Sequence, residues 1–188
     1  MATTLYDLSV LTFLQTLRSM GGVMDRAAAH CAATGADPED FVGARLYPDM
    51  APFHFQIEAA WHHAVWGVEA AKTGAFAPPA LVGPAPFGAL RAMMSRGVAA
   101  LEALSSEEVN SWAERKLDMV IYQPLDPDNA TTSGWGPRTL ALTPETFLLT
   151  YSLPNFYFHM VTAYNILRTR GVPIGKYHFQ GQLRVRMD

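Results

Sequence analysis

Apolar residues recur every three or four positions over four long stretches of this chain, which is the spacing of amphipathic α-helices. The predicted helices run from about Thr4 to Ala33, from about Pro52 to Lys72, from about Pro86 to Leu104 and from Thr143 to about Arg170. Each apolar face must be buried against a neighbouring element. The pattern therefore predicts an all-α protein built as a four-helix bundle.

Residue types at two places refine this pattern. Thr143 can cap the first turn of the last helix, Pro144 stands at its first position, and Gly171 follows its last turn. Gly21 and Gly22 interrupt the apolar stripe of the first helix. Such a glycine pair indicates either a close approach of another backbone or a bend.

The region between the third and fourth helices lacks helical spacing. Leu117 to Gln123 and Arg138 to Thr143 are strand-like, and the loop between them is rich in Pro, Asp, Asn, Ser and Gly. We therefore predict a small β-hairpin inserted before the last helix. The length of 188 residues fits a single domain over residues 1–188, with a C-terminal tail over residues 172–188.

Composition narrows the classes of function. The 17 acidic and 14 basic residues are interspersed and give a net charge of −3, so the basic stripe of a nucleic-acid binder is missing. The sequence contains neither a secretory signal nor an apolar run of the roughly 20 residues that a membrane span needs. We expect a cytoplasmic protein that binds neither nucleic acid nor membrane. Its charged fraction of 16% is low, which favours burial of apolar surface against another subunit.

The segment from Leu153 to His159 breaks two rules of an apolar helix. Pro154 stands in the helix interior, where it removes a backbone donor and favours a kink. Asn155 and His159 are four residues apart, so both side chains project from one helical face. Because buried polar groups need partners, both should meet hydrogen-bond donors, acceptors or a ligand from another helix.

The second helix supplies the adjacent histidines His62 and His63. Neighbouring residues point about 100° apart on a helix, so at most one of them should face the bundle centre. His63 and His159 could hold a divalent metal of the zinc or nickel type, and Asn155 is the candidate third ligand. Other polar residues near in sequence are Asp49, His54, Gln56 and Glu58. The alternative is a pair of core histidines held by hydrogen bonds alone.

Several segments together resemble one bacterial family of uncharacterised function within the DinB/YfiT-like superfamily of four-helix proteins. They are Tyr6 to Val10, Leu46 to Met50, the helix that ends in His63, Leu153 to Tyr164, and Gly171 to Lys176. The resemblance implies an up-down-down-up bundle that is frequently a homodimer. It also implies a divalent metal held by three histidines, in thiol-dependent transferases or isomerases and in metal-dependent hydrolases. His63 and His159 match two of these histidines, and Asn155 stands at the third position.

Two functions remain open at this stage. One is a metal-dependent or thiol-dependent small-molecule enzyme with a variant metal site at His63, Asn155 and His159. The other is a non-catalytic dimeric bundle that binds a small apolar ligand or a protein partner. Neither hypothesis identifies a substrate.

Overall fold

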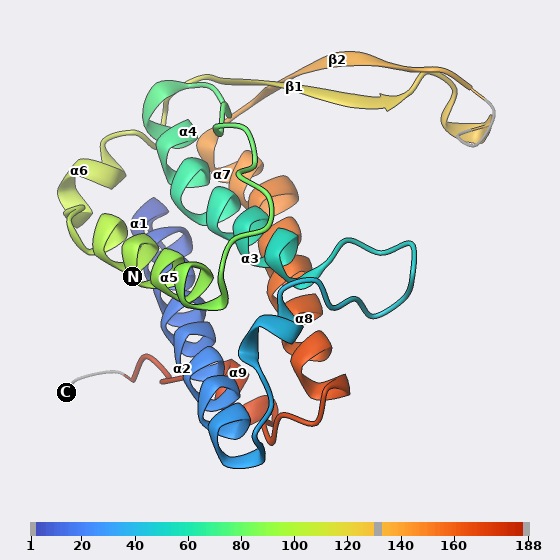
Figure 1. The fold of residues 1–188 in the computed structure, drawn as a ribbon. Helices are drawn as coiled ribbons and strands as arrows, with labels where there is room; N and C mark the ends of the chain where they lie inside the picture. The colour runs from blue at the N-terminus through green and yellow to red at the C-terminus, as the bar shows by residue number, and fades with distance from the viewer. Residues whose placement is uncertain (1–2, 130–132, 186–188) are drawn as a thin grey trace.

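The computed structural model describes residues 3–129 and 133–185, and its long helices pack side by side as a bundle (Figure 1). Helix α2 (Val10–Thr34) contacts α5 (Phe87–Glu102) and α8 (Leu153–Thr169), and α3 (Phe53–Trp61) contacts the same two helices. These contacts close a ring of four helices. The predicted up-down-down-up bundle is confirmed.

Short sequence signals set the ends of the helices. The Thr4 side chain caps α1 (Leu5–Leu8), and Ser9 separates α1 from α2, so the first predicted helix is divided close to its start. The Thr143 side chain accepts a hydrogen bond from the backbone of Thr146 and caps α7 (Pro144–Phe147), as predicted. Helix α4 (Gly67–Thr73) ends at Gly74 with φ of 83°, a left-handed conformation that suits glycine. The short helix α6 (Ser106–Asn110) follows α5.

The predicted hairpin is present and extends away from the helices (Figure 1). Strands β1 (Leu117–Pro124) and β2 (Trp135–Leu142) pair antiparallel, in a register that runs from Leu117 opposite Leu142 to Pro124 opposite Trp135. The second strand begins three residues earlier than predicted. Leu117 and Met119 are buried at the base of the hairpin, so one of its faces packs on the bundle.

Two helices of the bundle each contain one wide π-helical turn. These turns are η2 (His62–Trp66), between α3 and α4, and η4 (Leu148–Ser152), between α7 and α8. Pro154 is the second residue of α8 (Leu153–Thr169), in the first turn after η4. Because proline cannot donate the regular helical hydrogen bond, the widened turn accommodates it within a continuous helical segment.

The core is aromatic and tightly packed. Phe13 of α2 meets Phe156 of α8 edge-on, with ring centroids 4.9 Å apart. Cys31 is 1% exposed and belongs to this core. A Cβ atom added at Gly21 or Gly22 would find no neighbour within 4 Å among the described residues, so of the two predicted alternatives, close backbone approach or a bend, the close approach is not found there.

The C-terminal tail contains a short helix that its sequence pattern did not predict. Helix α9 (Lys176–Gln180) packs on α2, and the Ser19 hydroxyl donates to the Phe179 carbonyl at 2.7 Å. Residues 186–188 of the predicted tail lie outside the described residues. Within residues 3–129 and 133–185, every helix is too short or too polar to cross a bilayer.

Candidate functional site

The structure brings His63 and His159 together from two different helical segments. Their ring centroids lie 5.9 Å apart and their planes differ by 17°. His63 is buried in η2 and His159 is half-buried in α8. The ring of His62 lies 5.5 Å from that of Trp61 instead. His63 is therefore the histidine of the adjacent pair that faces His159.

Gln56 fixes the orientation of the His159 ring. The Gln56 Nε2 atom donates to the Ala51 carbonyl at 3.0 Å, which leaves its Oε1 atom 2.8 Å from His159 Nδ1. Since an amide oxygen can only accept, His159 Nδ1 carries the proton. The lone pair of the neutral ring then lies on Nε2, and this nitrogen is the one available to a ligand.

The backbone of His63 is fixed where the two wide turns meet. The Ser152 hydroxyl donates to the His63 carbonyl at 2.7 Å, while the Gly67 N–H donates to the carbonyls of His62 and Ala64. A Cβ atom at Gly67 would lie 2.5 Å from Ser152 Oγ. The two segments can approach this closely because residue 67 is glycine.

Aromatic rings pack around the pair. Phe76 stacks on His63 at 5.5 Å between centroids, Tyr151 meets His63 edge-on at 5.5 Å, and Phe55 meets His159 edge-on at 5.8 Å. Burial lowers the pKa of His63 to about 3, with a smaller contribution from the neighbouring histidines. Burial also lowers the pKa of His159 to about 4. Both imidazoles are neutral at pH 7.

The His63 Nδ1 atom and the Asn155 amide differ in their hydrogen bonding. His63 Nδ1 is buried and has no hydrogen-bond partner among the described residues. Asn155 Nδ2 donates to the Tyr151 carbonyl at 2.8 Å, so its amide is bonded to the backbone of its own helical segment. In the parts of the chain that the structure describes, no three His, Cys, Asp or Glu side chains lie close enough together to hold a metal ion.

The other polar residues considered from the sequence have separate roles or positions. Glu58 is 2% exposed. Its carboxylate accepts hydrogen bonds from the backbone N–H groups of Val82 and Gly83, in the connection between α4 and α5. Asp49 is exposed, and His54 lies half-buried with an unpartnered Nδ1 atom. Gln56 alone joins the pair. Gln56 lies seven residues before His63, which places both residues on one helical face two turns apart. This spacing was the sequence signal that could have identified Gln56 as part of the site.

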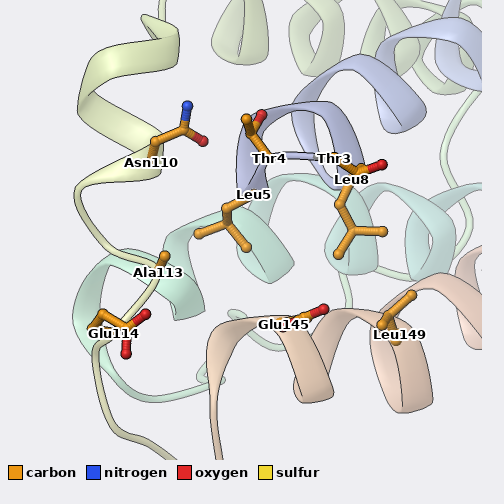
Figure 2. Close-up of a pocket in the computed structure, with 9 residues that line it drawn as sticks. All are labelled: Thr3, Thr4, Leu5, Leu8, Asn110, Ala113, Glu114, Glu145 and Leu149. Carbon is orange, nitrogen blue, oxygen red and sulfur yellow. The ribbon is translucent and has the colours of Figure 1, made fainter. Parts of the chain in front are cut away.

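A substrate-sized cavity lies elsewhere, at the end of the bundle where α1, α6 and the α7–η4 segment meet (Figure 2). Its volume is about 550 Å³, within the usual range for ligand pockets. Leucine side chains from α1 and η4 and the carboxylates of Glu114 and Glu145 line it. Neither His63 nor His159 contributes to this cavity.

Comparisons with known proteins place the chain in a family. The family described as a domain of unknown function, DUF1993, matches residues 5–180. A solved structure of a DinB family member protein from Shewanella denitrificans is 26% identical, with a TM-score of 0.74. The match covers 98% of this chain and 96% of that one. No curated protein matches significantly. The chain belongs to the DUF1993 family and has the DinB-like fold.

Proposed function

We propose that this protein binds a divalent metal of the zinc or nickel type through His63 and His159 and acts on a small molecule there. The observation that carries the proposal is the hydrogen bond from His159 Nδ1 to Gln56, which leaves Nε2 as a free ligand atom. A buried partner that fixes the tautomer of a histidine is the usual second contact of a metal ligand.

The residues fit such a metal in part. Two neutral imidazoles are suitable ligands for zinc or nickel, and the proposal is supported by the buried His63 Nδ1, which has no hydrogen-bond partner among the described residues. Among the described residues no His, Cys, Asp or Glu side chain completes a set of three with this pair, and the Asn155 amide nitrogen donates to the Tyr151 carbonyl. Catalytic zinc usually has three protein ligands, so the remaining positions would be filled from outside the chain.

A metal of this kind supplies Lewis-acid activation of a water or a thiol when it is bound. The chain itself contributes orientation and a dry environment. Gln56 holds His159 in one tautomer, Ser152 fixes the backbone of His63, and the surrounding rings keep both imidazoles uncharged. A small-molecule thiol that provided the missing ligand would reconcile a two-histidine site with thiol-dependent chemistry.

The second candidate function is a non-catalytic dimeric bundle. It is favoured by the stacking of His63 on Phe76, which makes the pair resemble ordinary aromatic core. We propose a homodimer in either case. Its support is the outer apolar stripe of the last helical segment, formed by exposed Leu149, Tyr157, Phe158 and Val161. Exposed apolar surface of this kind marks interaction sites.

Metal titration of tag-free protein separates the two functions. We expect one zinc or nickel ion per chain by calorimetry and elemental analysis, and loss of binding in His63→Ala and His159→Ala. His62→Ala is the matched control, because His62 is the adjacent buried histidine that contacts Trp61 instead. If all four proteins bound metal equally, or none did, the metal proposal would be wrong and the structural role would stand.

A further inference from the structure

Beyond its base, the outer face of the hairpin is largely apolar and exposed. Val120, Tyr122 and Trp135 are 61%, 68% and 63% exposed. The register places them on one face, since Val120 pairs with Thr139, Tyr122 with Pro137 and Pro124 with Trp135. We call the residues Val120, Tyr122, Pro124, Trp135, Pro137 and Thr139 the hairpin outer face.

This exposed face needs a partner for two reasons. An isolated two-stranded hairpin is marginally stable in water, and this one extends beyond the bundle that covers its base (Figure 1). Exposed strands in monomeric proteins are also usually protected by charged side chains. The nearest charge along β1 on this face is Asp118, at the base of the hairpin beside Gly74.

We propose that the hairpin is an arm that packs its outer face on a second copy of this chain. The surface that receives the arm is the outer apolar stripe at Leu149, Tyr157, Phe158 and Val161. The proposal rests on the homodimer proposed above and assigns its interface. In a twofold dimer the arm of each chain packs on the outer apolar stripe of its partner. Both apolar surfaces of both chains are then buried, because the same contact occurs twice in an isologous interface. A different protein partner on the arm would leave the stripe exposed.

The area agrees with a stable dimer. Val120, Tyr122 and Trp135 expose about 350 Å² of side chain, given 150–250 Å² for a whole aromatic side chain. Two arms and the two surfaces that they cover then bury on the order of 1,400 Å², within the range of specific protein interfaces. Tyrosine and tryptophan are also the residue types that most often dominate binding energy.

Sedimentation velocity on the full chain at about 10 μM tests the arm, since a stable dimer of this size persists at that concentration. We expect a dimer for the wild type and at least a roughly 100-fold weaker dimer for the double variant Tyr122→Ser/Trp135→Ser. The control is Arg138→Ser, because Arg138 is exposed but pairs with Ile121 on the opposite face of the hairpin. It should remain dimeric.

Each other outcome is decisive. A dimeric double variant would overturn the arm while leaving the homodimer intact, and a monomeric wild type would overturn both.

Tryptophan fluorescence covers the case in which the double variant misfolds. Diluting the wild type should shift its emission to longer wavelength as Trp135 returns to water, and Trp135→Phe should abolish the shift. A dimer that dissociates without this shift would also refute the arm. Metal binding at His63 is measured separately and is independent of either result.

Discussion

His159 Nδ1 lies 2.8 Å from Gln56 Oε1, and this contact joins α8 to α3 within the bundle. If the Gln56 amide rotated by 180°, its oxygen would face the Ala51 carbonyl and the hydrogen bond to that carbonyl would be lost. The contact therefore determines the His159 tautomer, and with it the nitrogen that faces a ligand.

Replacing Gln56 with leucine should weaken metal binding by about 10–100-fold, as loss of such second contacts does in other metal sites. It should also lower the free energy of unfolding by about 1 kcal/mol, since the half-buried His159 loses its hydrogen-bond partner at Nδ1. Calorimetric titration and urea denaturation measure the two effects. Gln56→Glu keeps an acceptor and should retain binding. Equal metal affinity in Gln56→Leu and the wild type would argue against Gln56 as a positioning residue.

Acidification should destabilise the metal-free protein. The pKa of His63 is about 3 in the folded state and about 6.5 in the unfolded state, so the unfolded chain binds more protons between these values. Stability is full above pH 6.5 and falls as the pH decreases, by about 2 kcal/mol from His63 at pH 5. Denaturation with chelator at pH 7 and pH 5 tests this. The variant His63→Phe should lose less stability than the wild type over this interval; an identical loss would contradict a buried neutral His63.

Gly67→Ala should disturb the contact between the two wide turns. Its Cβ atom would lie 2.5 Å from Ser152 Oγ, so the hydroxyl that bonds the His63 carbonyl must move. We expect a loss of about 1–3 kcal/mol in the free energy of unfolding. Gly22→Ala is the matched control: its Cβ would meet nothing within 4 Å, and it should stabilise α2 by about 0.5–1 kcal/mol. Thermal unfolding should therefore give a lower melting temperature for Gly67→Ala and a higher one for Gly22→Ala. An unchanged or raised melting temperature for Gly67→Ala would contradict the close contact with Ser152.

Asn155→His should strengthen metal binding. Positions 155 and 159 are four residues apart in α8, so a histidine at each projects from one helical face. Adding a third imidazole should raise zinc affinity by at least about tenfold. Asn155→Ala supplies no ligand and should bind as the wild type does. If Asn155→His bound no more tightly than Asn155→Ala, the metal would not lie beside this face.

The bundle could be predicted from the sequence because apolar spacing and end signals act locally. Thr143 starts a helix through its side-chain cap, Gly74 and Gly171 follow helix ends in a left-handed backbone conformation, and the hairpin followed from strand-like runs around a turn-rich loop. The α9 helix was missed because its five residues are too short to show periodicity.

The site could be predicted only in part. The pairing of His63 with His159 followed from the resemblance and from their helical positions. The wide turns could not be foreseen, because a π turn depends on packing between segments that are distant in sequence, such as Ser152 and His63. Asn155 was expected to point at the pair. Its amide nitrogen donates to the Tyr151 carbonyl of the same helical segment, a local bond that spacing alone does not reveal.

The most direct test of the central claim is a crystal structure of the protein grown with zinc, with diffraction data collected on both sides of the zinc absorption edge. We predict one anomalous peak bound to His159 Nε2 and the ring of His63, with the Gln56 contact retained. Peaks only at surface residues, with the two rings still stacked and free of metal, would contradict the proposal.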